Sequence, residues 1–327
     1  MQFHKHILNL DCVKESARLC AFIQQYARDY KRDGAVIGLS GGIDSALSAS
    51  LCVRALGKDN VLGLIMPEKE SSPVSAQYAL KHAKELGIWT EEVDITPVLE
   101  AFGTYEKREN VVKSLFPGFD ASCRFKIALP ADILAKDAFN FFTLKVIDAQ
   151  GEVKTARLNS DQIRTIVAAT DSKQRTRMMH LYYHAEKNNY FVCGTTNKPE
   201  AMQGLFVKYG DGGVDIEPLE HLYKDQVYQL AGHLGVIGEI MDRAPSPDTF
   251  SFTVTDEEFF FRMPYDKLDL LLYAWEHKVD VSVVCGIMGL AEEQVKRVFR
   301  DFSGKYSASK HLRRLPVTLA EGNSHAG

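Results

Sequence analysis

The chain of 327 residues lacks several features that would place it in a specialised class of protein. No apolar run approaches the roughly 20 residues that a membrane helix needs, and the first residues lack the apolar core of a signal peptide. The six cysteines are spread along the chain without a Cys-x-x-Cys pair, which disfavours a disulfide framework or a zinc site. Lysine and arginine are scattered, and the formal net charge is −4, so the charge pattern does not indicate a nucleic-acid partner. We therefore expect a cytoplasmic protein that acts neither on nucleic acid nor at a membrane.

One glycine-rich loop stands out, although it is neither a Gly-Lys-Ser/Thr phosphate loop nor a Gly-x-Gly-x-x-Gly dinucleotide motif. Ser-Gly-Gly-Ile-Asp-Ser at 40–45 joins the apolar run 35–39 to a helical pattern that ends at Leu56. Its small side chains let the backbone expose N–H groups at a helix N-terminus, which is an anion-binding arrangement. Asp44 would repel a phosphate unless a divalent metal lay between them. A tight strand-to-helix turn is the other interpretation, but the full string favours a nucleotide phosphate site.

The surrounding pattern alternates strands and helices, which predicts an α/β protein with a doubly wound parallel sheet. Such a sheet binds ligands at the carboxyl ends of its strands. We expect strands at 35–39, 60–66, 88–95 and 190–194, and helices at 11–30, 44–56, 73–86 and 223–234.

Residues 116–169 interrupt this alternation. They contain an expected hairpin at 140–158, and an interruption of this length is typical of a lid or binding insertion. Its lysines Lys126, Lys136 and Lys145 are expected to be solvated surface residues rather than substrate contacts. We place the insertion within a single domain of residues 1–318, in which helices resume near Asp171 and form the C-terminal part 256–316. The tail 319–327 is expected to be disordered.

The end of the fourth strand offers a second set of polar groups. Thr195 and Glu200 follow it, so both can reach the same space as Asp44. Carboxylates and hydroxyls beside phosphates are the oxygen ligands that Mg²⁺ prefers. Taken alone, Glu200 is equally typical of an exposed helix start, and the glycine-rich loop 208–215 is equally typical of a surface loop.

The order of motifs resembles the NAD synthetase family, within the ATP pyrophosphatases. The motifs are SGGxDS at 40–45, RTRM at 175–178, GTxNxxE at 194–200, KYGDGGxD at 208–215 and Tyr-Lys at 223–224. The resemblance covers residues 35–99 and 172–248, with a weaker similarity at 309–316. It implies the adenine nucleotide alpha hydrolase-like form of the fold, with a helical C-terminal extension and an inserted hairpin or lid region.

The resemblance also implies site residues. ATP would be bound by Ser40, Gly41, Gly42, Asp44, Ser45, Thr195, Lys224 and Ser246. Mg²⁺ would be held by Asp44 and Glu200, with Asp44 and Lys224 as the catalytic residues. The carboxylate substrate would contact Arg175, Lys208, Asp211, Asp215 and His311.

The activity that the resemblance implies is amidation of deamido-NAD with ATP and ammonia through an acyl-adenylate, in a homodimer. The ammonia would be free or delivered by a separate glutaminase. Where the family has a lysine after the C-terminal histidine, this chain has Leu312, so an amide ligase for another carboxylic acid stays open. A non-catalytic ATP-binding regulator is the third interpretation.

Overall fold

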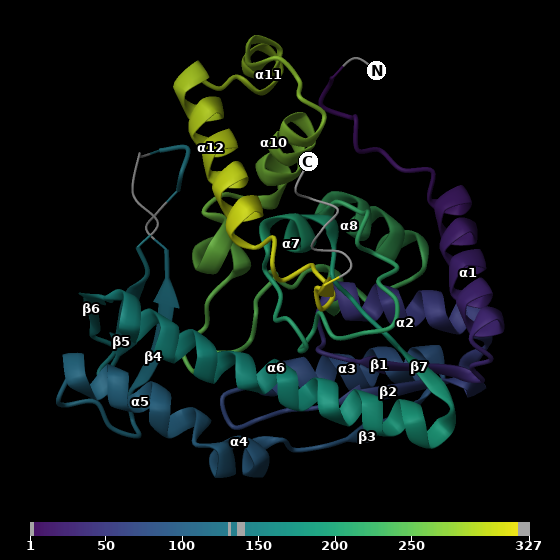
Figure 1. Ribbon diagram of the computed structural model, residues 1–327, viewed down its shortest axis with the longest axis horizontal. Helices are drawn as coiled ribbons and strands as arrows, with labels where there is room; N and C mark the ends of the chain where they lie inside the picture. Colours follow the sequence, from purple (N-terminus) through teal and green to yellow (C-terminus); the bar gives the residue numbers. More distant parts are fainter. Residues whose placement is uncertain (1–2, 130–131, 136–140, 320–327) are drawn as a thin grey trace.

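The central element is a four-stranded parallel sheet in the order β3-β2-β1-β7 (Figure 1). The structure is a computed structural model and describes residues 3–129, 132–135 and 141–319. The strands are β1 (Gly34–Gly38), β2 (Val61–Ile65), β3 (Trp89–Glu92) and β7 (Tyr190–Cys193). All four strands were expected from the sequence, and the parallel α/β class is confirmed.

Helices cover both faces of this sheet, because its central strand is apolar on both sides. Ala35 and Ile37 of β1 pack into one core with α1 (Cys12–Asp29), α2 (Ile43–Leu56), α3 (Pro73–Leu86) and α8 (Lys224–His233). Val36, between them, packs into a second core with α4 (Thr96–Phe102), α5 (Thr104–Leu115) and α6 (Ser160–Asn188). This alternation of side chains along one strand is what a doubly wound sheet requires.

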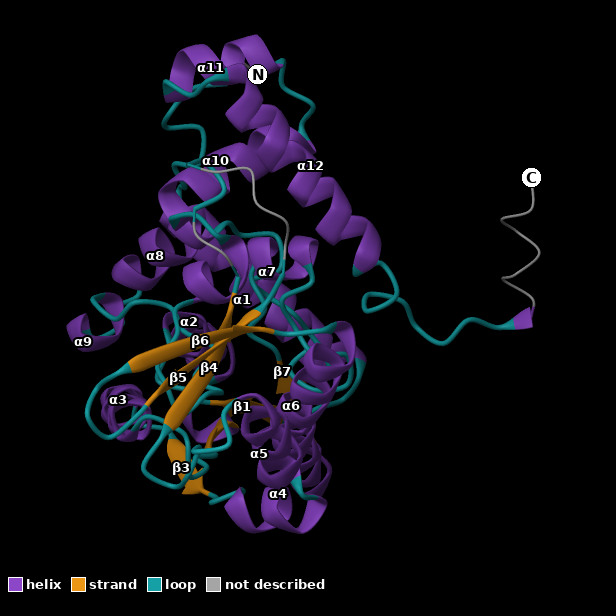
Figure 2. Cartoon of the chain, turned by 90° about the vertical axis from the view of Figure 1, so that its left-hand side faces the viewer, coloured by secondary structure: helices purple, strands orange, loops and turns teal. Residues whose placement is uncertain are grey.

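The inserted region forms a separate antiparallel sheet in the order β4-β5-β6 (Figure 2). The expected hairpin is present as β5 (Thr143–Ile147) and β6 (Val153–Arg157), while β4 (Arg124–Ala128) was not expected from the sequence. The helix expected to begin near Asp171 begins at Ser160 instead. Asn159 and Gln162 form a capping box at its N-terminus, a signal that the sequence interpretation missed.

One lysine of this region departs from expectation. Lys126 is only 7% exposed and pairs with Glu258, so the prediction that it is a solvated surface residue is wrong. Lys145 is about one-third exposed and pairs with the same carboxylate. Lys136 lies outside the described residues.

The C-terminal helices form a unit above the sheet, as expected (Figures 1 and 2). They are α10 (Tyr265–Glu276), α11 (Val281–Met288) and α12 (Glu292–Ala308), preceded by a π-helical turn, η2 (Glu257–Phe261). Their own apolar core includes Tyr223, so this unit is tied to the start of α8. The expected tail lies outside the described residues except for Leu319.

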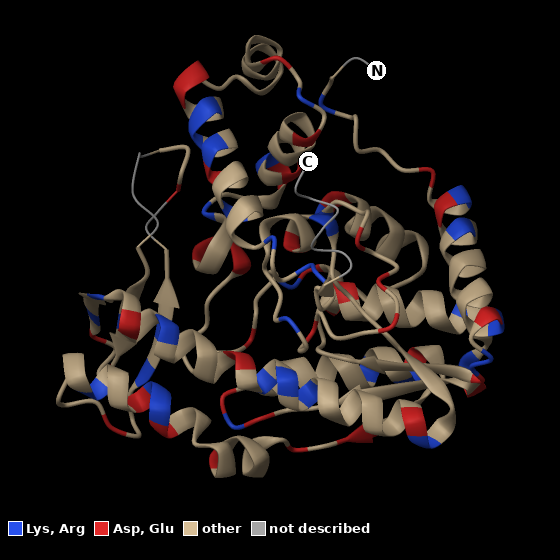
Figure 3. Cartoon of the chain, in the orientation of Figure 1, with Lys and Arg blue, Asp and Glu red and all other residues tan. Residues whose placement is uncertain are grey.

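Charge is distributed over the whole fold. Figure 3 shows basic and acidic positions interspersed on most helices, as the scattered sequence pattern indicated. Among the described residues, no helix has the length and apolar character that crossing a bilayer requires.

Candidate active site

The loop 40–45, which we call the phosphate loop, connects the carboxyl end of β1 to α2. Gly41 has φ +73°, and a Cβ atom there would lie 2.1 Å from the carbonyl oxygen of Ser75. Only glycine fits this position, because both the backbone angle and the close approach exclude a side chain. The Ser45 hydroxyl donates to the Gly42 carbonyl at 3.0 Å and accepts from the Ser40 N–H at 3.2 Å, which closes the loop.

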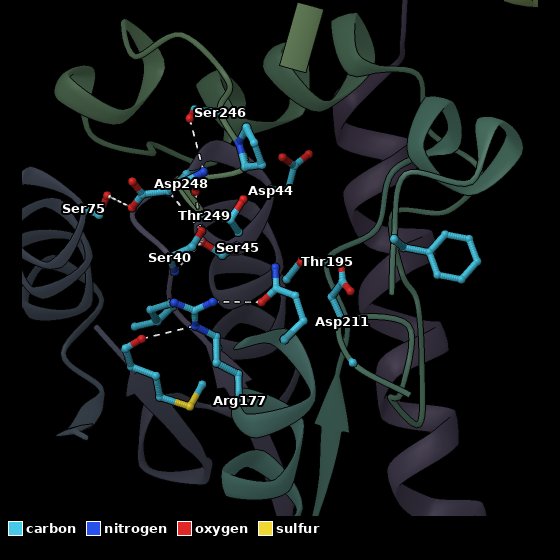
Figure 4. A pocket seen from close by; sticks show the side chains of 18 of the residues that line it. Ser40, Asp44, Ser45, Ser75, Arg177, Thr195, Asp211, Ser246, Asp248 and Thr249 are labelled. Carbon is cyan, nitrogen blue, oxygen red and sulfur yellow. Dashed lines mark hydrogen bonds between the residues drawn. The ribbon is translucent and has the colours of Figure 1, made fainter. Parts of the chain in front are cut away.

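A cavity of about 340 Å³, the main cavity, opens beside this loop (Figure 4). It lies at the carboxyl ends of the parallel strands, where a doubly wound sheet binds its ligands. Of the residues expected to bind ATP or metal, those that line it are Ser40, Gly42, Asp44, Ser45, Thr195, Glu200, Lys224 and Ser246. Gly41 shapes the loop but does not line the cavity.

Two carboxylates and one ammonium group meet in this cavity. The Lys224 Nζ lies 2.6 Å from an Asp44 carboxylate oxygen and 3.8 Å from Glu200 Oε1. The Asn197 side chain donates to the other Asp44 oxygen at 3.0 Å. Three segments distant in sequence, at the starts of α2, α7 (Lys198–Gln203) and α8, therefore converge on one point.

The local structure of each segment explains this convergence. Asn197 caps α7 and forms a capping box with Glu200, so the Glu200 carboxylate is held at the first turn of that helix. Lys224 is the first residue of α8 and is 1% exposed. A buried ammonium group requires nearby negative charge, and Asp44 and Glu200 supply it.

The electrostatics of this group are strongly coupled. Burial and the neighbouring Asp44 charge raise the pKa of Glu200 well above its ordinary value. Burial lowers the pKa of Lys224, but the Asp44 and Glu200 carboxylates outweigh this and raise it. Lys224 is therefore a permanent cation in the cavity. A further cation bound beside both carboxyl groups would favour their charged forms and so lower the pKa of Glu200.

Three polar residues around the cavity were missed by sequence reasoning. Asp248 accepts from the Ser75 hydroxyl at 2.6 Å, and Arg243 donates to the Gly41 carbonyl at 3.2 Å. Asp256 is 6% exposed and accepts from the Tyr265 hydroxyl at 3.0 Å. All three line the cavity from the irregular stretch between α9 (Gly238–Met241) and η2, where no periodic pattern marked them.

Arg177, the second arginine of the RTRM motif, also lines the main cavity. Its guanidinium donates to the Met66 carbonyl at 3.2 Å and to the Gln174 side chain at 3.0 Å. Figure 4 shows the guanidinium facing the same space as Ser40.

The residues expected to bind the carboxylate substrate are placed differently from one another. Asp211 lines the main cavity, and burial raises its pKa to about 6. Lys208 lines a second cavity of about 200 Å³ near the C-terminal segment and donates to the carbonyls of His311 and Arg314.

The other three expected substrate residues line neither of these two cavities. Arg175 is exposed and donates to the Lys208 carbonyl at 3.3 Å. Asp215 accepts the Val192 N–H of β7 at 2.7 Å, so it holds the loop against the sheet. His311 is exposed, and its ring nitrogen contacts the Ala308 carbonyl at 3.0 Å.

A parallel α/β sheet with a glycine-rich anion-binding loop after its first strand, facing two carboxylates and a buried lysine, defines a nucleotide-binding protein of the ATP pyrophosphatase class. The comparisons with known proteins narrow this class. The family model for NAD synthase matches residues 15–129 and 128–316, and the chain belongs to that family.

Close relatives extend over nearly the full chain. This chain is 42% identical over 316 residues to the NH(3)-dependent NAD(+) synthetase of Mesorhizobium japonicum, and the alignment covers 96% of this chain and 99% of that protein. It is 37% identical over 308 residues to the NH(3)-dependent NAD(+) synthetase of Thermotoga maritima, covering 94% and 99%.

Solved structures share the fold of this chain. The NMN synthetase of Francisella tularensis superposes with a TM-score of 0.65 at 25% identity, covering 95% of this chain and 99% of that chain. The NH3-dependent NAD synthetase of Campylobacter jejuni has the same fold, with a TM-score of 0.62 at 24% identity and coverage of 95% and 100%.

Proposed function

We propose that this protein is an ammonia-dependent NAD⁺ synthetase, a ligase that forms a carbon–nitrogen bond. It converts deamido-NAD⁺, ATP and ammonia into NAD⁺, AMP and pyrophosphate. The observation that carries the proposal is the meeting of Asp44, Glu200 and Lys224 beside the phosphate loop. The names of the full-length relatives support the acceptor and the nitrogen source.

The chemistry fits these residues. A carboxylate does not react with ammonia, so its oxygen first attacks the α-phosphorus of ATP and pyrophosphate leaves. Ammonia then attacks the acyl carbon, loses a proton and displaces AMP. The protein must neutralise phosphate charge and align the reactants, which Lys224 and the N–H groups of the phosphate loop do.

The donor set also fits a magnesium ion. Mg²⁺ is commonly held by one or two carboxylates together with substrate phosphates and water, and Asp44 and Glu200 face one space next to the phosphate loop. We propose these two as its ligands. The ion would supply charge neutralisation at the phosphates. Within the described residues no group of three or more His, Cys, Asp or Glu forms a complete protein cage, so the phosphates would complete the coordination.

The identity of the acceptor acid is tested by comparing two candidate substrates. Because one structural neighbour is named an NMN synthetase, nicotinic acid mononucleotide is assayed beside deamido-NAD⁺, with ammonium as the nitrogen source. We propose deamido-NAD⁺ as the preferred substrate, a homodimer as the assembly and the cytoplasm as the compartment. The six free cysteines support the reducing compartment.

The test is release of AMP, with mass spectrometry of the product. AMP and NAD⁺ should form in equal amounts only when ATP, Mg²⁺, ammonium and deamido-NAD⁺ are all present. Asp44→Asn should lower the rate by about 100-fold or more while the protein stays folded, because it removes a carboxylate ligand of the Mg²⁺ that neutralises the phosphates. Tight ATP binding without AMP formation across several acids would favour the regulator instead, and an active Asp44→Asn enzyme would contradict the metal role.

A further inference from the structure

The inserted sheet does not reach the main cavity directly. No described residue between 116 and 159 lines that cavity. The adjoining side of the cavity is instead formed by residues 244–259, which we call the pocket segment. It contributes Ser246, Asp248, Thr249, Asp256 and Phe259. The insertion can therefore influence a bound nucleotide through the pocket segment, and also through α6, whose Ile166 packs against the inserted sheet and whose Arg177 lines the cavity.

The pocket segment has little regular structure, although the Asp256 N–H donates to the Pro245 carbonyl at 3.1 Å and the Ser246 hydroxyl donates to the Val254 carbonyl at 2.7 Å within it. Residues 244–255 form no helix or strand, and two of them are prolines. A chain of this kind loses considerable conformational entropy on being fixed, so external contacts must fix it. Its backbone groups also need hydrogen-bond partners elsewhere, because regular structure does not provide them.

Strand β4 of the insertion and the residue after it supply some of those partners. The Phe252 N–H donates to the Phe125 carbonyl at 3.1 Å, and the Phe125 N–H donates to the Ser251 hydroxyl at 3.1 Å. Further along, the Leu129 N–H donates to the Glu258 carbonyl at 3.2 Å. The pocket segment therefore lies along the edge of β4 that β5 leaves open.

Ion pairs reinforce the same contact. The Glu258 carboxylate receives Lys126 of β4 at 2.7 Å on one oxygen and Lys145 of β5 at 2.8 Å on the other. Lys126 also donates to the Thr253 carbonyl at 2.9 Å. The three charged groups are partly or largely buried, where hydrogen-bonded pairs are stronger than on an open surface.

A shared hydrophobic core completes the junction. Phe125, Ile127, Leu144 and Val146 of the inserted sheet pack in one cluster with Phe250 and Val254 of the pocket segment. This cluster is distinct from the two cores that flank the parallel sheet. The Arg108 guanidinium lies over the rings of both Phe125 and Phe250, 4.8 Å and 4.9 Å from their centroids, and donates to the Thr249 carbonyl at 3.1 Å.

We propose that the inserted sheet is a positioning element for the nucleotide, and that Lys126, Lys145 and Glu258 are its positioning residues. By fixing the pocket segment, they hold Asp248, Thr249 and Asp256 toward the cavity before the ligand binds. The inference rests on ATP as the ligand of the proposed function. It assigns the insertion an indirect role in place of the lid or binding insertion that the sequence indicated.

The test measures ATP binding without turnover. The probe is α,β-methylene-ATP with Mg²⁺, which cannot release pyrophosphate, and the variants are Lys126→Met, Lys145→Met and Glu258→Gln. In each variant we expect the apparent Kd for the probe to rise about tenfold. This corresponds to a tenfold fall in the fraction of molecules whose pocket is already formed, since the apparent affinity is proportional to that fraction. Lys154→Met is the matched control, because Lys154 is in the same inserted sheet, is exposed and pairs only distantly with Asp148 at 3.7 Å.

Two further measurements separate positioning from general stability. Hydrogen exchange of the amides at 249–255 should become faster in Glu258→Gln without ligand, and added ligand should restore protection. In the double variant Lys126→Met/Glu258→Gln, the change in binding free energy should be smaller than the sum of the two single changes, because both substitutions break the same ion pair.

Each outcome decides the proposal. Weaker binding and faster local exchange in the three variants, with Lys154→Met unchanged, support it. A lower melting temperature with unchanged Kd at a temperature where all variants are folded overturns it and leaves a purely structural insertion. If the unchanged protein does not bind the probe, the proposed function fails together with this inference. If it binds and only the variants show no change in Kd, the inference alone fails.

Discussion

At the scale of single residues, the site depends on positions where only one residue type fits. Gly41 is the clearest, because it combines a positive φ with a backbone oxygen that would lie 2.1 Å from any Cβ atom. Gly57, at the other end of α2, also has a positive φ, +85°, but nothing lies within 4 Å of its Cβ position. Comparing substitutions at the two glycines therefore distinguishes the effect of backbone strain, present at both, from that of a steric clash, present only at Gly41.

We predict that Gly41→Ala lowers the free energy of unfolding by at least about 2 kcal/mol and strongly weakens ATP binding, because strain and a backbone clash add. Gly57→Ala should cost about 1–3 kcal/mol from strain alone, because φ 85° and ψ 148° lie in a region that almost only glycine adopts, and should leave ATP binding unchanged. Urea unfolding and equilibrium binding measure both. Equal losses of binding in the two variants would show that the clash at Ser75 is unimportant.

Glu217 is a partly buried carboxylate next to the site. It accepts the Thr196 N–H at 3.0 Å and the Thr196 hydroxyl at 2.9 Å, and so holds the turn that carries Thr195. Burial raises its pKa to about 8. A raised carboxyl pKa means that the folded state binds the proton more tightly than the unfolded state does.

The stabilisation that the protonated Glu217 gives the folded state is therefore fully present below the ordinary carboxyl pKa. It is lost as the pH rises toward 8, the raised pKa of the folded state. We predict that Glu217→Gln, which mimics the protonated form, melts progressively higher relative to the unchanged protein as the pH is raised from about 5 to about 8.5. Glu220→Gln, an exposed neighbour, serves as the control. A difference between the two melting temperatures that does not vary with pH would show that Glu217 is charged throughout.

At the scale of elements, α10 holds the two segments that carry Lys224 and Glu200. Asp269 accepts the N–H of Asp225 at 2.7 Å, at the N-terminus of α8. Two turns further along, Glu276 accepts Lys198 at 2.7 Å and also the Tyr223 hydroxyl. Residues seven apart share a helix face, so one side of α10 positions both segments.

We predict that Asp269→Ala and Glu276→Gln each lower kcat about 10-fold to 100-fold, as loss of groups that orient ligand-bearing residues commonly does. Asp269→Asn should recover part of the rate, because its carbonyl oxygen still accepts the hydrogen bond. Asp266→Asn, exposed on the same helix, is the control. Steady-state AMP release gives kcat and KM. A fall in melting temperature without a change in kcat would assign α10 a structural role only.

At the scale of the whole molecule, the phosphate loop, the pocket segment and the starts of α7 and α8 come from separate parts of the chain and meet at one cavity. A ligand that bridges them stabilises the entire fold, since it binds only the folded state.

We predict that ATP with Mg²⁺ at 100 times its Kd adds about 2.7 kcal/mol to the free energy of unfolding, seen as a clear rise in melting temperature. Removing Mg²⁺ with EDTA should abolish most of this rise, and Asp44→Asn should show little effect of Mg²⁺. Scanning calorimetry with and without ATP, and with and without Mg²⁺, measures the rise in melting temperature. An equal rise with ATP alone would indicate that the carboxylates do not bind metal.

The amino-acid sequence by itself determined the parallel sheet, the phosphate loop and the family, because short apolar runs, glycine spacing and capping residues act locally. It also indicated that Asp44 and Glu200 lie together, since the strand ends of such a sheet share one edge, and the family resemblance added Lys224 to them. The tertiary structure alone decided how Asp256 and Asp248 reach the cavity, because they lie in a segment without periodicity. It also decided that Lys126 is buried, since its partner Glu258 is more than a hundred residues away and no local pattern links them.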